Sequence, residues 1–173
     1  MGLPMGRIMT PADTREPDWA DLSLKLRDMA RALVGARGED AADELAQRTI
    51  VRLMVKRPDR ADHLGYARTT MVRLWLDEQR SAKRRLARMA VWARTAPTRT
   101  RDADRLDESE RTERIRRRIE RLPPTQRAAL AMRIVGGMSS ARIAEALNMS
   151  EAAARSALHV ARSRLREELE AES

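Results

Sequence analysis

The 173-residue chain has 35 lysines and arginines against 26 acidic residues, a formal net charge of +9, and it contains no cysteine. The missing cysteines exclude disulfides and thiolate metal sites. No stretch approaches the roughly 20 apolar residues of a membrane-spanning helix, and the N-terminus has no hydrophobic signal core, so we expect a cytoplasmic protein without membrane insertion. The positive charge favours a polyanionic partner, either nucleic acid or an anionic surface.

The composition predicts an all-α fold. Ala, Leu, Met and Arg dominate, phenylalanine is absent, and aromatic residues make up only 2% of the chain. These are helix formers, and the residues that favour strands are scarce. Since apolar residues are 42% and charged residues 35%, we expect a thin and split core. The predicted order is a disordered tail (1–18), a small helical domain (19–94), a flexible acidic linker (95–113) and a second small helical domain (114–173).

Three amphipathic helices are predicted in the first block. The first starts at Trp19, and its apolar residues recur at steps of four, three and four, as expected for one face of a helix: Leu22, Leu26, Met29 and Leu33. Gly35 and Gly38 end it. The second begins with acidic residues, which suit the positive end of a helix dipole, and closes at Pro58. The third runs from about 62 to 88, and we interpret its Trp75 as a core residue rather than a stacking platform.

The stretch 95–113 has almost no large apolar residue, so it cannot offset its ordering entropy by burial. Its second half is acidic. This composition fits simple solvation, and it equally fits a segment that occupies a channel built for nucleic acid.

The second block follows the plan of a helix-turn-helix unit. Pro123 and Pro124 interrupt the chain, Thr125 is expected to cap the following helix, and the two glycines at 136–137 end it. A short helix capped by Ser139 is then joined to a longer one by the three-residue turn 148–150. A short helix, a tight turn and a longer helix form the helix-turn-helix pattern.

The last helix carries two stripes about 100° apart, as 3.6 residues per turn requires. The first is a packing face, formed by Ala154, Leu158, Ala161 and Leu165. The second is basic, formed by Arg155, His159, Arg162 and Arg166. A basic stripe can be a solvated face, but its position on the second helix of such a unit favours DNA contact. The run "RSAKRRLAR" (80–88) is a second basic patch, for which we favour contact with phosphates.

Within the basic stripe, we expect some residues to read bases and others to contact phosphates. Base reading should rest on Arg155, Ser156 and His159, because they lie near the end that enters the groove, while Arg162 and Arg166 should contact phosphates. Ala152 and Ala153 are small enough to let the first turn approach base edges closely.

These two blocks resemble the extracytoplasmic-function group of the bacterial sigma-70 family. The segment "LPPTQRAALAMRIVGGMSSARIAEALNMSEAAARSALHVARSRLREEL" resembles domain 4, with its LP-x-x-x-R opening, G-x-S turn and I-A-x-x-L helix. "AADELAQRTIVR" resembles the helix that docks on the polymerase β′ clamp. "LWLDEQRSAKRR" resembles the family's D-x-x-R followed by basic residues, here Asp77 and Arg80.

The resemblance implies a transcription initiation factor that binds core RNA polymerase at its β′ clamp and β flap and directs it to promoter DNA. Core polymerase binding would use Asp43, Glu44, Leu45, Gln47 and Arg48. Opening of the −10 element would use Arg73, Asp77, Arg80, Lys83, Arg84 and Arg85. Binding of the −35 element would use Arg142, Ser150, Ala152, Ala153, Arg155, Ser156, His159, Arg162 and Arg166. An anti-sigma factor is an expected partner; no cofactor, metal or small-molecule substrate is expected.

The sequence departs from the family pattern at several positions. Arg73 stands where the family usually has an asparagine that helps to hold a flipped −10 base. Arg142 replaces the usual glutamate of the capping box, which forfeits the reciprocal cap and adds a cation for a phosphate. The stretch 57–62 lacks the usual aromatic residue, and the recognition helix starts with three alanines in place of G-T-V.

Other functions fit the sequence less well. Catalysis is disfavoured because the two histidines lie on separate blocks, the carboxylates are spread among arginines, and no glycine-rich phosphate loop occurs. A stand-alone helix-turn-helix regulator would explain the second block alone. An interaction-only role, as a decoy for an anti-sigma protein, is a further alternative because of Arg73.

Overall fold

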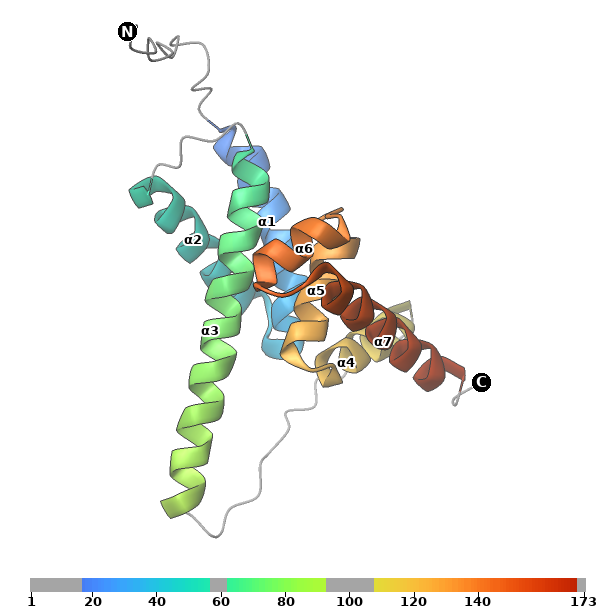
Figure 1. The fold of residues 1–173 in the computed structure, drawn as a ribbon. Helices are drawn as coiled ribbons and strands as arrows, with labels where there is room; N and C mark the ends of the chain where they lie inside the picture. The colour runs from blue at the N-terminus through green and yellow to red at the C-terminus, as the bar shows by residue number, and fades with distance from the viewer. Residues whose placement is uncertain (1–16, 57–61, 93–107, 171–173) are drawn as a thin grey trace, which may run out of the picture.

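The computed structural model of the protein describes residues 17–56, 62–92 and 108–170. Every regular element within these ranges is a helix, so the all-α prediction is confirmed (Figure 1). The elements are α1 (Trp19–Val34), η2 (Gly35–Arg37), α2 (Glu39–Lys56), α3 (His63–Trp92), α4 (Glu108–Arg121), α5 (Pro124–Ile134), α6 (Ser140–Leu147) and α7 (Glu151–Glu170).

Helix α1 begins and ends where the sequence predicts. The Asp18 carboxylate accepts hydrogen bonds from the backbone N–H groups of Ala20 and Asp21, each at 3.1 Å, and so caps the first turn. At the other end Gly35 has a φ of +61°, a conformation that glycine adopts at little cost. The predicted apolar face is buried. It turns toward α2 and α3, which both contact α1.

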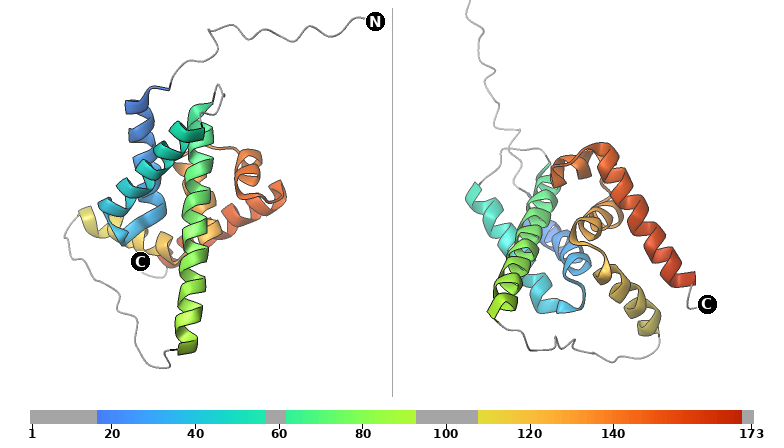
Figure 2. Two further views of the ribbon diagram at one scale, coloured as in Figure 1. Left: turned by 90° about the vertical axis from the view of Figure 1, so that its left-hand side faces the viewer. Right: turned by 60° about the horizontal axis from the view of Figure 1, so that its bottom comes forward.

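Helix α3 is the longest element and organises the fold. In its N-terminal half, Ala67, Met71, Val72 and Trp75 are buried, and Trp75 is only 1% exposed, which confirms its interpretation as a core residue. From Lys83 to Arg88 the side chains are exposed. This C-terminal half projects beyond the other helices in two views of the molecule (Figures 1 and 2). One half of α3 therefore packs, and the other half presents the predicted basic patch.

Two boundaries in the second block differ from the prediction. Helix α4 begins at Glu108, inside the stretch expected to be a flexible linker, because Glu and Arg are good helix formers even without large apolar neighbours. Residues 93–107 of that predicted linker, and the tail 1–16, lie outside the described residues. The cap of α5 is Pro123, without a side-chain hydrogen bond, and Pro124 occupies the first helical position. The prediction that Thr125 caps this helix is therefore wrong.

The helix-turn-helix geometry is as predicted. Ser139 caps α6 by accepting a hydrogen bond from the N–H of Arg142 at 3.3 Å. Asn148 ends α6 in the left-handed region with a φ of +54°, which asparagine tolerates better than most residues. The Ser150 hydroxyl then accepts from the N–H of Ala153 at 3.1 Å and starts α7. These caps fix the angle at which α7 leaves the turn.

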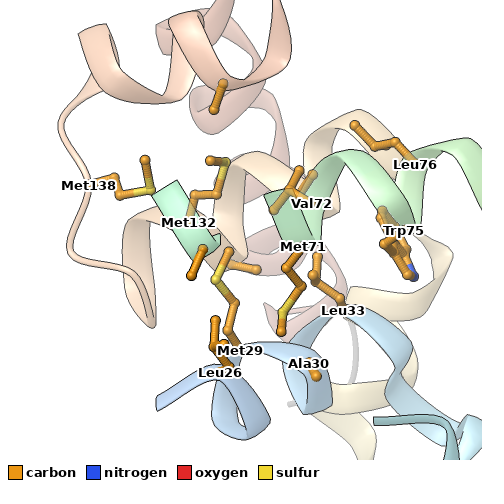
Figure 3. Close-up of a cluster of buried hydrophobic side chains, with 14 of the residues drawn as sticks. Leu26, Met29, Ala30, Leu33, Met71, Val72, Trp75, Leu76, Met132 and Met138 are labelled. Carbon is orange, nitrogen blue, oxygen red and sulfur yellow. The ribbon is translucent and has the colours of Figure 1, made fainter. Parts of the chain in front are cut away.

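The core is continuous across the two blocks, so the expectation of a split core is wrong. One cluster of buried side chains includes Leu26 and Met29 of α1, Met71 and Val72 of α3, and Met132 of α5. Figure 3 shows Met132 in the same cluster as Met29 and Met71 of the first block. Helices α5 and α6 both contact α3, and α5 also contacts α1. A smaller cluster around Leu122, Leu130 and Ala161 lies within the second block.

The continuous core predicts a sharp contrast between two positions of α5. Met132 is fully buried, whereas Ile134 is 68% exposed. Met132→Ala should lower the free energy of unfolding by about 2–5 kcal/mol, the usual cost of deleting a large buried side chain. Ile134→Ala should change it by less than about 0.5 kcal/mol. Urea unfolding followed by circular dichroism measures both, and equal effects would contradict the described packing.

Candidate nucleic-acid interface

Helix α7 separates a packing face from a basic face. Ala154, Leu158 and Ala161 are buried against the rest of the second block, and Leu165 is half-buried. The neighbouring stripe, formed by Arg155, His159, Arg162 and Arg166, is exposed along its whole length. The geometric part of the prediction is thus confirmed. An exposed row of cations on one helix face is a surface that can track phosphates.

The first turn of α7 is open to solvent. Ala152 and Ala153 are exposed, so backbone can approach a partner closely there. The Arg155 guanidinium donates to the Glu151 carboxylate at 2.6 Å and is held toward the start of the helix. Glu151 was not predicted as part of this surface, although its spacing of four residues from Arg155 is the signal for such a pair.

The basic end of α3 is a second exposed surface. Asp77 accepts a hydrogen bond from Arg80 at 3.1 Å, and Arg84 donates to the hydroxyl of Ser81 at 2.9 Å. Lys83 and Arg85 are exposed. In Figure 1 this end of α3 and helix α7 extend in different directions from the core. The structure therefore keeps the two predicted DNA surfaces apart.

Two predicted DNA-binding residues, Arg73 and Arg142, lie away from these surfaces. Arg73 is on α3, and its guanidinium donates to the carbonyl oxygens of Ala146 and Glu145, at 3.1 and 3.3 Å, at the end of α6. Arg142 is on α6, and its guanidinium donates to the carboxylate of Asp62, just before α3. Each residue therefore binds the opposite block.

Asp62, the partner of Arg142, was not predicted as a site residue. Its pKa is lowered, first because its carboxylate accepts from Arg142 and second because it accepts from the N–H of Gly65, at 2.7 Å. A lowered pKa in the folded state means that the ionised carboxylate stabilises the fold above about pH 4, its ordinary range, and that this contribution is lost as the pH falls through the lowered value. The pair is therefore fully formed at neutral pH.

The predicted polymerase-binding residues on α2 divide into buried and exposed groups. Leu45 is only 2% exposed and belongs to the core, so its expected direct contact with a partner is not available in this structure. Asp43 pairs with Arg27 of α1 at 2.6 Å, and Arg48 pairs with Glu78 of α3. The exposed members line a shallow groove between α2 and α3, together with five residues that were not predicted for this site. The groove is lined by Glu44, Gln47, Arg48, Val51, Arg52, Val55, Lys56 and Leu74.

Two apolar side chains of this groove are exposed to solvent. Val51 and Val55 are 58% and 78% exposed. Apolar side chains surrounded by charged ones are typical of protein interaction sites. The signal in the sequence was weak, because valine at these positions reads equally well as part of a buried helix face.

No helix in the part of the chain that the structure describes could span a bilayer. The same described residues contain no group of three histidine, aspartate or glutamate side chains placed to hold a metal ion.

Comparison with known proteins identifies the second block. Residues 112–165, which span most of α4 through α7, match the family model "Sigma-70, region 4". The structure of the sigma factor RpoE in complex with the anti-sigma factor NepR from Bartonella quintana has the same fold, with a TM-score of 0.66 over 89% of this chain and 95% of that chain, at 19% sequence identity. No curated protein matches the chain in sequence. The resemblance seen in the sequence is thereby supported in two ways: residues 112–165 are similar to sigma-70 region 4, and the fold is that of a solved sigma factor over 89% of the chain.

Proposed function

We propose that the protein is a transcription initiation factor of the extracytoplasmic-function group, which binds core RNA polymerase in the cytoplasm and directs it to specific promoters. The observation that carries the proposal is the region 4 match over residues 112–165, on the block where α7 exposes its basic stripe. The stripe would lie along the −35 element. The first turn of α7 would enter the major groove, as in other helix-turn-helix units.

The first block, 19–92, has surfaces suited to the two remaining parts of the proposed function, polymerase binding and contact with the −10 element. The groove on α2 and α3 offers exposed apolar and charged side chains to a protein partner, and we assign it to the polymerase β′ clamp. The exposed basic end of α3 would contact the backbone near the −10 element, through Asp77, Arg80, Lys83, Arg84 and Arg85. Neither surface is arranged as a catalytic site, and we propose a binding function without enzymatic activity.

An anti-sigma factor is the second partner in the proposal. The sigma factor from Bartonella quintana was solved in complex with the anti-sigma factor NepR, and its fold matches 89% of this chain. We infer that this chain also pairs with a protein that masks its polymerase and promoter surfaces.

Run-off transcription tests the proposal. Core polymerase with this protein should produce a defined transcript from a promoter selected with the holoenzyme, and core polymerase alone should not. If the protein binds duplex DNA but gives no gain over core polymerase, the initiation factor is excluded and the stand-alone helix-turn-helix regulator takes its place. Such regulators usually dimerise to read paired half-sites, so the oligomeric state is a second readout.

The division within the basic stripe gives a prediction for DNA binding. Arg162→Ala should weaken binding on all duplexes and reduce the salt slope by about 1, because it removes one phosphate contact. Arg155→Ala should instead change the preferred −35 sequence, at a cost of about 1–3 kcal/mol on the original site. Salt-dependent titrations on matched and scrambled duplexes separate the two.

The control is Arg164→Ala. Arg164 lies on the same helix outside the stripe, 3.4 Å from the side chain of Gln126, and this variant should behave as the unmodified protein. Identical behaviour of the Arg155 and Arg162 variants would refute the assigned roles.

The groove gives a prediction for polymerase binding. Gln47→Ala combined with Val51→Ala should weaken binding to core polymerase, because both side chains are exposed in the groove, and should leave the helix content unchanged. Leu24→Ala is the matched control, since Leu24 is an exposed apolar residue on α1, 63% accessible and outside the groove. Leu45→Ala is unsuitable for this test because it would open a cavity in the core. Equal affinities of the double variant and the control for core polymerase would show that the groove is not the polymerase-binding site.

A further inference from the structure

The exposed stripe of α7 begins with an acidic residue, Glu151. Starting from it, positions on one face of the helix follow at steps of four, four, three and four, and they are Arg155, His159, Arg162 and Arg166. The side chains of Arg155 and Glu151 are 62% and 47% exposed. The proposed DNA surface therefore carries a carboxylate at the end that would enter the major groove.

Two effects within the protein favour an acidic residue at this position. Glu151 is the first residue of α7, where a negative charge suits the positive end of the helix dipole. Its carboxylate also accepts a hydrogen bond from the Arg155 guanidinium at 2.6 Å. Exposed ion pairs of this kind contribute little to stability. These effects stabilise the helix start, but they do not explain a carboxylate on a surface that meets phosphates.

A carboxylate on a DNA-binding surface has a cost and a use. It repels nearby phosphates, so it lowers the affinity for any duplex that offers it no hydrogen-bond donor. Among the groups that base pairs present in the major groove, the N4 amino group of cytosine is the one that a glutamate typically accepts from. An acidic residue in this row therefore favours duplexes that place a cytosine before it and disfavours the others.

The pair of Arg155 and Glu151 matches the major-groove edge of a G·C base pair. Guanine presents two acceptors, N7 and O6, and the cytosine amino group is a donor beside O6. A guanidinium has five N–H donors, so one bond to Glu151 leaves donors for both guanine acceptors. A carboxylate has two oxygens, each able to accept more than one bond, so Glu151 retains an acceptor for the cytosine amino group.

An A·T pair presents a different order of groups. Its edge reads acceptor, donor, acceptor, from adenine N7 through adenine N6 to thymine O4. This order sets the adenine amino group against the Arg155 guanidinium and thymine O4 against the Glu151 carboxylate. Two like groups would then face each other twice, and buried polar groups without partners are costly.

The first turn of α7 leaves room for both contacts. Ala152 and Ala153 are exposed and carry only methyl groups. The Ser150 hydroxyl accepts from the N–H of Ala153 at 3.1 Å and so fixes the helix start beside Glu151. The ion pair itself holds two long side chains in one arrangement before DNA binds, which reduces the conformational entropy lost on binding.

We propose that Glu151 is a specificity-determining residue of the DNA surface. With Arg155 it reads one G·C base pair, by accepting a hydrogen bond from the cytosine amino group, and it repels duplexes that have another pair there. The inference rests on the proposed function in placing the first turn of α7 in the major groove.

Duplex binding by the free, full-length protein tests this assignment without polymerase. A selection from random duplexes gives the preferred sequence, and the position of interest is the one whose preference is lost in Arg155→Ala. Fluorescence anisotropy then compares G·C with A·T at that position. The unmodified protein should prefer G·C by roughly 5- to 150-fold, the range for one good bidentate contact.

Glu151→Gln separates base reading from stabilisation of the helix. Glutamine has the same length but no charge, and its amide suits adenine rather than cytosine. The preference for G·C should fall by roughly fivefold or more, and the affinity for scrambled duplexes should rise because a negative charge near the phosphates is removed. A role confined to the helix dipole or the ion pair would instead lower the affinity for all duplexes by the same factor.

A cytosine analogue without the exocyclic amino group isolates the proposed hydrogen bond. Placed opposite the same guanine, it should weaken binding of the unmodified protein, and it should have little further effect on Glu151→Gln, because the two changes remove the same contact. Glu167→Gln is the matched control, with the same change of charge at an exposed position near the other end of α7. It should respond to the analogue as the unmodified protein does.

An equal effect of the analogue on the unmodified protein and on Glu151→Gln would overturn the proposal. A selection without a G·C preference at the position that depends on Arg155 would also overturn it. Run-off transcription is a separate measurement. If transcription succeeds while Glu151→Gln keeps the full preference, the initiation factor stands and the role of Glu151 falls. If the preference shifts as expected while transcription fails, Glu151 reads DNA in a stand-alone regulator.

Discussion

The packing of α5 and α6 against α1 and α3 is the constraint on which the rest of the structure depends. Burial of one large apolar side chain contributes about 1.5–3 kcal/mol, and several such side chains from both blocks share the core. The ion pair between Arg142 and Asp62 is about half exposed, and exposed pairs contribute about 0–1 kcal/mol. The apolar seam therefore supplies most of the attraction. Arg73 and Arg142 add polar contacts across the same seam.

Periodicity in the sequence was enough to predict the faces of individual helices. The buried stripe of α1, the core position of Trp75 and the two stripes of α7 all follow from spacing, because a regular helix fixes which side chains share a face. The partner of each face could not be predicted in this way. Arg73 and Arg142 were predicted as DNA contacts, and local sequence gave no sign that both would also contact the opposite block. The burial of Leu45 could not be predicted either, since the position of a residue in a motif does not reveal whether it is buried.

The surfaces proposed for DNA and for polymerase are all accessible in this packed arrangement. The basic stripe of α7 and the basic end of α3 are both exposed, and the groove on α2 is open. The packing of α5 and α6 against α1 and α3 therefore covers none of the three surfaces.

The distance between the two blocks in the free protein tests this packing most directly. The chain has no native cysteine, so spin labels can be placed at two exposed positions, with Asp40→Cys on α2 and Glu167→Cys on α7. Pulsed electron paramagnetic resonance should give one narrow distance, because one core joins the two blocks. A broad distribution of distances would contradict the packing of α5 and α6 against α1 and α3.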